Sequence, residues 1–117
     1  MDLDFQSRFQ KIILKLEESG LVYAEAKASS WHSQELCSSI KASLMLKALS
    51  EIPGTSVAKA EIIAKASDDY KKHLSETAEK IRAEHIAKVE YEKWNASFEG
   101  NRSLCSLEKK TRQLIGD

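Results

Sequence analysis

The stretch Ile52-Pro53-Gly54-Thr55-Ser56 is the only decisive break in this chain of 117 residues. Proline has no backbone N–H to donate to a helical hydrogen bond, and glycine tolerates the positive φ that tight turns use. Pro53 is the only proline, and few glycines flank it. We therefore expect two long helical arms, at about residues 4–51 and 57–115, joined by a turn at 52–56 into an antiparallel hairpin.

The composition fits this expectation of an all-α, coiled-coil-like protein that forms a single helical domain over residues 1–117. Charged residues make up 31% of the chain and aromatic residues 7%, a composition that is typical of long helices. Lys and Arg number 18, and Asp and Glu also number 18, so the net charge is zero. This balance argues against a surface devoted throughout to binding phosphate, and against an acidic mimic of DNA.

A seam of apolar and small residues follows the first arm at alternating spacings of four and three. This is the heptad pattern of a coiled coil. Its members are Phe5, Phe9, Ile12, Leu16, Ser19, Tyr23, Ala26, Ser30, Ser33, Cys37, Ile40 and Leu44. We expect one long helix, and the places where it could bend are Gly20 and the serine cluster at residues 29–33, since serine side chains compete for backbone hydrogen bonds.

The second arm is expected to bend near Ala66-Ser67, because Ser67 can cap a helix whose first turn contains acidic residues. Its apolar residues fall on two neighbouring stripes: Tyr70, Leu74, Ala78, Ile81 and His85, then Ala87, Tyr91, Trp94 and Phe98. Gly100-Asn101 marks a helix end or kink.

Two helices cannot surround such a seam by themselves, so we expect a homodimer with a four-helix-like core. The residues expected in this dimer or hairpin seam are Phe5, Phe9, Ile12, Leu16, Tyr23, Cys37, Ile40, Leu44, Tyr91, Trp94 and Phe98.

The sequence offers no motif for catalysis or metal binding. The spacings of His32 from Cys37 and of His85 from Cys105 do not match structural zinc sites, which need two close pairs of ligands. We therefore expect no catalytic residue, no metal, no cofactor and no enzymatic activity. No long apolar run and no apolar leader are present, which predicts a cytoplasmic protein without a membrane segment, whose cysteines are free thiols.

One region could bind nucleic acid directly, because aromatic side chains beside basic ones can stack on single-stranded bases. Such a site would use Lys93, Trp94, Arg102, Lys109, Lys110 and Arg112. The same aromatic residues equally suit packing in a dimer, and the neutral net charge does not favour nucleic acid.

Four segments carry a resemblance to a known family. They are IKASLM at residues 40–45, PGTSVAKAE at 53–61, ASDDY at 66–70 and YEKW at 91–94, with Arg102 following. In this order they resemble small helical phage and prophage proteins, which are encoded among recombination and replication genes beside single-strand annealing or single-strand-binding proteins. The resemblance implies a bacterial host cell and a recombination or replication protein as partner, and it assigns no catalytic residue.

The sequence and the resemblance leave three alternative functions open. The first is a non-enzymatic helical interaction protein, an accessory factor in phage DNA recombination or replication that acts through protein partners. The second is a direct single-stranded nucleic-acid binder that uses the aromatic and basic C-terminal region. The third is a structural or chaperone-like coiled-coil assembly protein.

Overall fold

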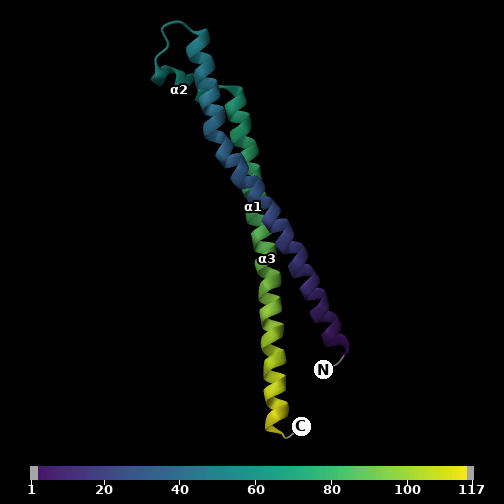
Figure 1. Cartoon of the computed structure of the whole chain (residues 1–117). Coiled ribbons are helices and arrows are strands. Elements are labelled where there is room, and N and C mark those ends of the chain that lie inside the picture. Colours follow the sequence, from purple (N-terminus) through teal and green to yellow (C-terminus); the bar gives the residue numbers. More distant parts are fainter. Residues whose placement is uncertain (1–2, 116–117) are drawn as a thin grey trace. The chain divides into compact units, whose positions relative to one another are not determined.

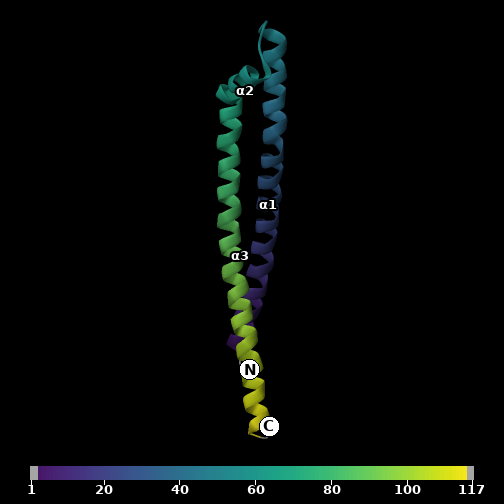
Figure 2. The ribbon, with the colours of Figure 1, turned by 90° about the vertical axis from the view of Figure 1, so that its left-hand side faces the viewer.

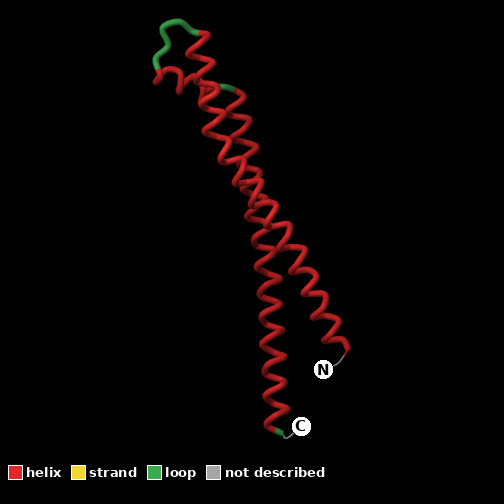
Figure 3. The backbone as a smooth tube through the Cα atoms, viewed as in Figure 1, coloured by secondary structure: helices red, strands yellow, loops and turns green. Residues whose placement is uncertain are grey.

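The computed structural model describes residues 3–115, and every element in that range is an α-helix (Figure 1). Helix α1 spans Leu3–Glu51, α2 spans Val57–Ala66 and α3 spans Asp68–Leu114. Figure 3 shows the break between α1 and α2 as loop. The all-α fold class and the turn at residues 52–56 are therefore confirmed, and α1 is one continuous helix through Gly20 and residues 29–33.

Of the helix end or kink expected at Gly100-Asn101, the helix end is wrong, because α3 continues to Leu114. A glycine inside a helix costs only about 1 kcal/mol relative to alanine, which neighbouring interactions can offset. Here the Asn101 side chain donates a hydrogen bond of 2.8 Å to the Ser97 carbonyl, and Arg102 lies 3.8 Å from Glu99.

The turn between α1 and α2 combines a glycine conformation with a serine cap. Gly54 has a φ of 78°, a value that favours glycine over residues with a Cβ atom. The Thr55 hydroxyl donates a 2.7 Å hydrogen bond to the Ile52 carbonyl. Ser56 has an extended backbone, and its hydroxyl accepts a hydrogen bond from the Lys59 N–H at 3.2 Å. These contacts satisfy backbone groups that the two helix ends would otherwise leave unpaired.

Ser67 separates α2 from α3, which confirms the expected bend at Ala66-Ser67. Its backbone is extended, with a ψ of 146°, and its N–H donates to the Ala64 carbonyl at 3.2 Å. The Ser67 hydroxyl then accepts from the Tyr70 N–H at 3.1 Å, so one residue ends one helix and caps the next. Asp68 and Asp69 occupy the first turn of α3, where the helix dipole favours negative charge.

Packing divides the chain into two compact units. Unit 1 combines the chain up to Ala24 with the chain from His85 onward, and unit 2 contains residues 25–84. Each unit therefore holds a part of α1 and a part of α3, and α2 belongs to unit 2. The expectation of a single domain stays a prediction.

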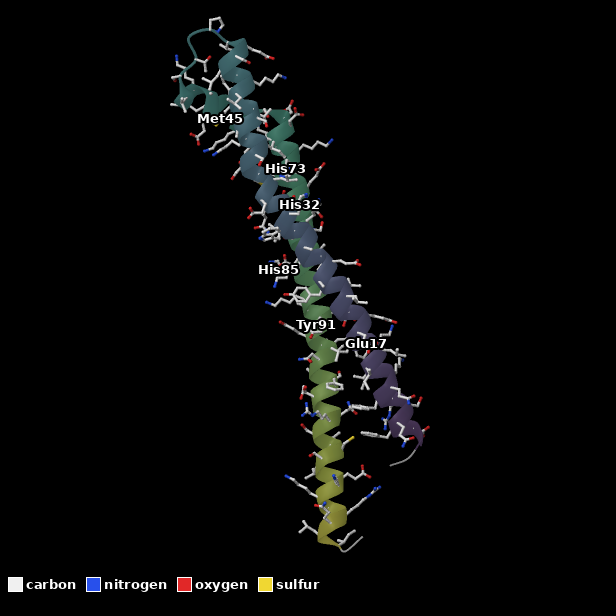
Figure 4. The ribbon with its side chains drawn as sticks, viewed as in Figure 1. Glu17, His32, Met45, His73, His85 and Tyr91 are labelled. Carbon is white, nitrogen blue, oxygen red and sulfur yellow. The ribbon has the colours of Figure 1, made fainter. Side chains whose placement is uncertain are left out.

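In unit 1, aromatic rings join the two helices in antiparallel order. The ring centroids of Phe9 and Phe98 lie 5.6 Å apart, and those of Tyr23 and Tyr91 lie 5.9 Å apart. Tyr91 is labelled in Figure 4. A Cβ atom added to Gly20 would lie 3.5 Å from the Tyr91 ring. The Tyr91 ring therefore packs against α1 at Gly20, where no side chain stands between them.

In unit 2, α2 runs across the ends of α1 and α3 (Figure 2). Ala60 and Ala64 of α2 are fully buried, and Ala48 of α1 is nearly so. Small side chains of this kind let helix backbones approach closely. Glu61 also ties α2 to α1, because its carboxylate lies 3.5 Å from Lys41 and 3.1 Å from Lys65. The hydrogen bond and charge of Lys65, together with Lys41, lower the pKa of Glu61.

A buried polar layer joins α1 and α3 in unit 2. The hydroxyls of Ser33 and Thr77 share a 2.6 Å hydrogen bond, and these residues are 1% and 5% exposed. The His73 Nε2 lies 3.0 Å from the Ser33 carbonyl, to which it donates, and 3.3 Å from the Thr77 hydroxyl. Figure 4 labels His73 on α3. Ser30 is fully buried beside this layer, and its hydroxyl accepts a hydrogen bond from Gln34.

The structure places every member of the expected α1 seam at a buried or half-buried position. The expected stripe on α3 is wrong in part. Leu74, Ala78 and His85 are exposed, and the side facing α1 instead carries Thr77, buried, with His73 half-buried. On α3 the residues that face α1 therefore include the polar residues His73 and Thr77. The prediction from the sequence had assigned this side to apolar residues alone.

We predict that the Ser33–Thr77 pair couples α1 to α3. Ser33→Ala and Thr77→Val should each lower the free energy of unfolding by about 1–3 kcal/mol, because each leaves a buried hydroxyl without this partner. Urea unfolding at fixed protein concentration measures both, and Ser38→Ala, at an exposed position of α1, is the matched control. The double variant should lose less than the sum of the single variants; strict additivity would contradict the coupling.

Candidate functional site

The basic residues expected to bind nucleic acid are largely paired with glutamates of their own helix. Lys93 Nζ lies 3.4 Å from the Glu90 carboxylate, and Arg102 and Arg112 pair with glutamates at 3.8 and 2.9 Å. Each glutamate lies three or four residues before its partner, where side chains of a helix meet. Lys109 and Lys110 are exposed near the end of α3. Local neutralisation weakens the attraction that this region could exert on a phosphate backbone.

Lys93 does not share a face of α3 with Arg102. The two residues are separated by about two and a half helical turns, so their side chains leave the helix on opposite sides, and both are exposed. Arg102 and Lys109 are about two turns apart and lie on the same side. The structure therefore separates Lys93 from the basic residues nearer the end of α3.

Trp94 is half-buried and already engaged. Its indole Nε1 donates a 2.9 Å hydrogen bond to the Glu90 carboxylate, and the Lys93 ammonium lies 4.7 Å from its ring centroid. A stacking platform for bases needs an open aromatic face with positive charge around it. At Trp94 the lysine of the same helix lies over the ring, and the indole N–H is bonded to a carboxylate, which brings negative charge to the ring's edge.

Trp94 lines a hollow of about 200 Å³ in unit 1. The residues around this hollow are Lys15, Glu18, Ser19 and Val22 of α1, with Ala87, Glu90 and Trp94 of α3. Its apolar walls come from Val22, Ala87 and the Trp94 ring, and Lys15 lies 3.5 Å from Glu18 at its edge. A space of this kind, apolar inside and carrying both signs of charge at its rim, suits an inserted aliphatic side chain better than a phosphate.

The pKa of Glu90 is lowered from its ordinary value. The hydrogen bond from the Trp94 indole is the largest cause, followed by that from Lys93, and the charges of Lys93 and Lys15 act in the same direction. Lys15 belongs to α1, so its effect on Glu90 crosses the hollow from one helix to the other. The carboxylate is thus held ionised by its neighbours on both helices.

A second hollow, of about 210 Å³, lies in unit 2 near the turn. It is lined by Leu44, Lys47, Ala48, Glu51 and Ile52 of α1 and the following turn, and by Ile63, Ala64, Ser67 and Asp69 of the later chain. Ile52 and Ile63 are 45% and 38% exposed, so apolar side chains at this hollow reach solvent.

Large apolar side chains are prominent on the surface of both units. The buried apolar residues of the described chain are the alanines at positions 48, 60, 64 and 87. In contrast, the exposed ones include Leu14, Leu21, Val22, Trp31, Leu46, Val57, Ile62, Ile86, Val89, Leu104 and Leu107, each at least 57% exposed. Large apolar residues are normally among the first to be buried in a protein, so this distribution leaves an unusual share of large apolar side chains exposed to solvent.

The residues outside these surfaces show no arrangement for metal chemistry. Within residues 3–115, no group of three or more His, Cys, Asp and Glu side chains is placed to hold a metal ion. Cys37 and Cys105 are free and half-buried, and the Cys37 thiol lies 3.7 Å from the Ser33 carbonyl. None of the helices in the described part of the chain is both long and apolar enough to cross a membrane.

Sequence reasoning missed Val22, the aliphatic residue of α1 that lines the first hollow, because it lies beside the heptad seam and not in it. It also missed Ile86 of α3, which is exposed. Helical spacing could have found them: Val22 lies one turn after Glu18, and Ile86 lies one turn before Glu90. A residue flanking the seam of two helices stays exposed, because neither helix of the pair covers that side.

We predict that Trp94 controls the ionisation of Glu90. In Trp94→Phe the pKa of Glu90 should rise toward its ordinary value, because the largest cause of its lowering is removed. Carbon-detected NMR titration of the glutamate carboxyl groups measures this shift, with Glu92, an exposed neighbour, as the internal reference. Because the folded state lowers the pKa of Glu90, its ionised carboxylate stabilises the folded protein at pH values above the pKa of the unfolded chain. This contribution to the free energy of unfolding is lost as the pH falls through the pKa of the folded state. An unchanged Glu90 pKa in the variant would contradict the assignment.

No family model, curated protein or solved structure matches the chain.

Proposed function

We propose that this protein is a non-enzymatic helical interaction protein, which associates with a second copy and acts through protein partners. The observation that carries the proposal is the distribution of apolar side chains. Alanines occupy its buried apolar positions, whereas leucine, isoleucine and valine side chains lie on the surface of both units. Covering these side chains with another protein surface removes apolar area from water, which is the main driving force of association.

The proposed process is DNA recombination or replication in a phage or prophage, with a single-strand annealing or single-strand-binding protein as partner. Its support is the resemblance of the segments at residues 40–45, 53–61, 66–70 and 91–94 to small helical phage proteins. Action through a protein, and not directly on DNA, agrees with the zero net charge and with the glutamate partners of Lys93, Arg102 and Arg112.

We predict that sedimentation velocity at micromolar concentration will give twice the mass of the chain, because the exposed apolar surface is then covered. The same sample is titrated with a single-stranded oligonucleotide at low salt, where phosphate contacts are strongest. We expect no binding that falls with added salt.

Three results are informative in this experiment. A monomer at every concentration would contradict self-association. Salt-dependent binding of the oligonucleotide would favour the direct nucleic-acid binder instead. Addition of a purified phage single-strand annealing protein tests the process: a heavier complex supports it, and an unchanged mass distribution contradicts it.

A further inference from the structure

We propose that a second copy of this chain packs antiparallel on one side of α3, which we call the α3 outer stripe. Its large apolar residues are Ile86, Val89, Leu104, Leu107 and Leu114, and Gly100 lies at its middle. The whole stripe belongs to unit 1. The inference rests on the proposed self-association and names the surface that carries it.

The stripe has the spacing of a coiled-coil seam. Ile86 and Val89 are three residues apart, as are Leu104 and Leu107, and Leu114 follows Leu107 after seven. Positions 93, 96, 100 and 111 fill the gaps between them at steps of three and four. Such steps keep side chains on one side of a helix, and the stripe continues for about four heptads, a length that is typical of coiled coils.

The stripe lies on a different side of α3 from the contact with α1. In unit 1 that contact is made by the rings of Tyr91 and Phe98, which stack on Tyr23 and Phe9 of α1. Val89 lies two residues before Tyr91, and two residues turn an α-helix by about 200°. The large apolar residues of the stripe are 57–88% exposed. A further helix can therefore pack on the stripe without displacing α1.

Gly100 marks the place where a further helix can approach most closely. A Cβ atom added to Gly100 would meet no atom of α1 within 4 Å, and the residue is exposed, so the packing of unit 1 does not require a glycine there. A glycine in the interior of a helix costs about 1 kcal/mol relative to alanine. Ala96 lies one turn earlier on the stripe, and side chains this small shorten the distance at which two helices pack. A helix crossing at Gly100 gives this costly residue a role.

The charge of α3 changes sign at Gly100, and this order selects the occupant. Residues 85–99 contain three acidic and two basic side chains, whereas residues 101–115 contain one acidic and four basic side chains. Two copies of α3 that run antiparallel and cross at Gly100 set the acidic half of each against the basic half of the other. A parallel pair would set like charges together, which is unfavourable. The stripe therefore complements itself, as the interface of a symmetric dimer must.

Glu92 and Lys110 are the pair that this arrangement brings together. They are eighteen residues apart, which is five full helical turns, so they lie on the same border of the stripe, and both are exposed. An antiparallel crossing at Gly100 places Glu92 of one copy near Lys110 of the other. The two-fold axis repeats this pair, so the dimer contains it twice.

Lys93 is the charged member of the stripe, but its ammonium group is turned toward the side of α1. It lies 3.4 Å from the Glu90 carboxylate and 4.7 Å from the centroid of the Trp94 ring. Glu90 and Trp94 both line the hollow between α1 and α3. The aliphatic stem of Lys93 therefore remains on the stripe, while its charge lies at the edge of the contact.

The first test places a larger side chain at the crossing. Gly100→Leu adds apolar surface and improves helix propensity, so an unspecific hydrophobic contact would become tighter. At a helix crossing the leucine holds the two helices apart instead, and the dissociation constant of the dimer should rise at least about ten-fold. Ser106→Leu, at an exposed position two residues after Leu104 and off the stripe, is the matched control and should leave the constant unchanged. Sedimentation velocity measures both variants, and circular dichroism checks that helix content is retained.

The second test exchanges charges between the copies. Lys110→Glu and Glu92→Lys should each raise the dissociation constant about three-fold or more at low salt, because each sets like charges together twice in the dimer. An equimolar mixture of the two variants restores both pairs of opposite charge. At the same total concentration, the mixture should therefore contain more dimer than either variant alone.

The outcomes separate the two proposals. A wild-type protein that is monomeric throughout overturns self-association and the α3 outer stripe together. A wild-type dimer that Gly100→Leu leaves unchanged or tightens, that Ser106→Leu weakens equally, or whose charge variants gain nothing on mixing overturns the stripe alone. Weakening by Gly100→Leu without an effect of Ser106→Leu, together with recovery in the mixture, supports the stripe.

Discussion

Two packed helices share only one seam, and a seam buries one narrow stripe of each helix. This constraint governs the whole protein. In unit 2 the seam between α1 and α3 contains Ser30, Ser33 and Thr77, which are buried, so its central contacts are small and polar. The large apolar side chains that lie outside the seam, such as Leu21, Leu46 and Ile62, remain exposed. The seam holds each pair of helical segments in position, and the surfaces outside it are left available for association.

The polar layer of Ser33, Thr77 and His73 makes the pairing of α1 with α3 specific, but it reduces the apolar area that the seam can bury. A buried polar group is costly unless it is hydrogen-bonded, and a shift of one helix along the other would separate the Ser33 hydroxyl from Thr77 and the Ser33 carbonyl from His73. The layer thus favours one alignment of α1 against α3 within unit 2. In unit 1, the contact of Phe9 with Phe98 and that of Tyr23 with Tyr91 fix the alignment by shape.

Local chemistry made much of the fold predictable. Pro53 and Gly54 determine the turn, Ser67 caps α3, and the spacing from Phe5 to Leu44 identifies the side of α1 that faces α3. The inward side of α3 could not be found by following apolar residues, because His73 and Thr77 meet the serines of α1 there. The small polar residues of the α1 seam were the available signal, since they require polar partners.

The candidate site was less predictable than the fold. The sequence draws attention to Trp94 as an aromatic residue beside basic ones, but the hollow beside it depends on contacts between two helices that are distant in sequence. Lys93, Arg102 and Arg112 suggest a basic surface in the sequence, and in the structure each of them pairs with a glutamate of its own helix. Oppositely charged residues spaced three or four apart can be recognised in a sequence. Which side of the packed helices each pair occupies can be determined only from the structure.

The central claim is that the stable fold of this protein includes a second copy, because one chain cannot cover its own apolar surface. Association that accompanies folding makes stability depend on protein concentration. The most direct measurement is therefore the thermal unfolding midpoint, followed by circular dichroism from low to high micromolar concentration. The account predicts a midpoint that rises steadily with concentration. A midpoint that is the same at every concentration, with reversible unfolding, would contradict it.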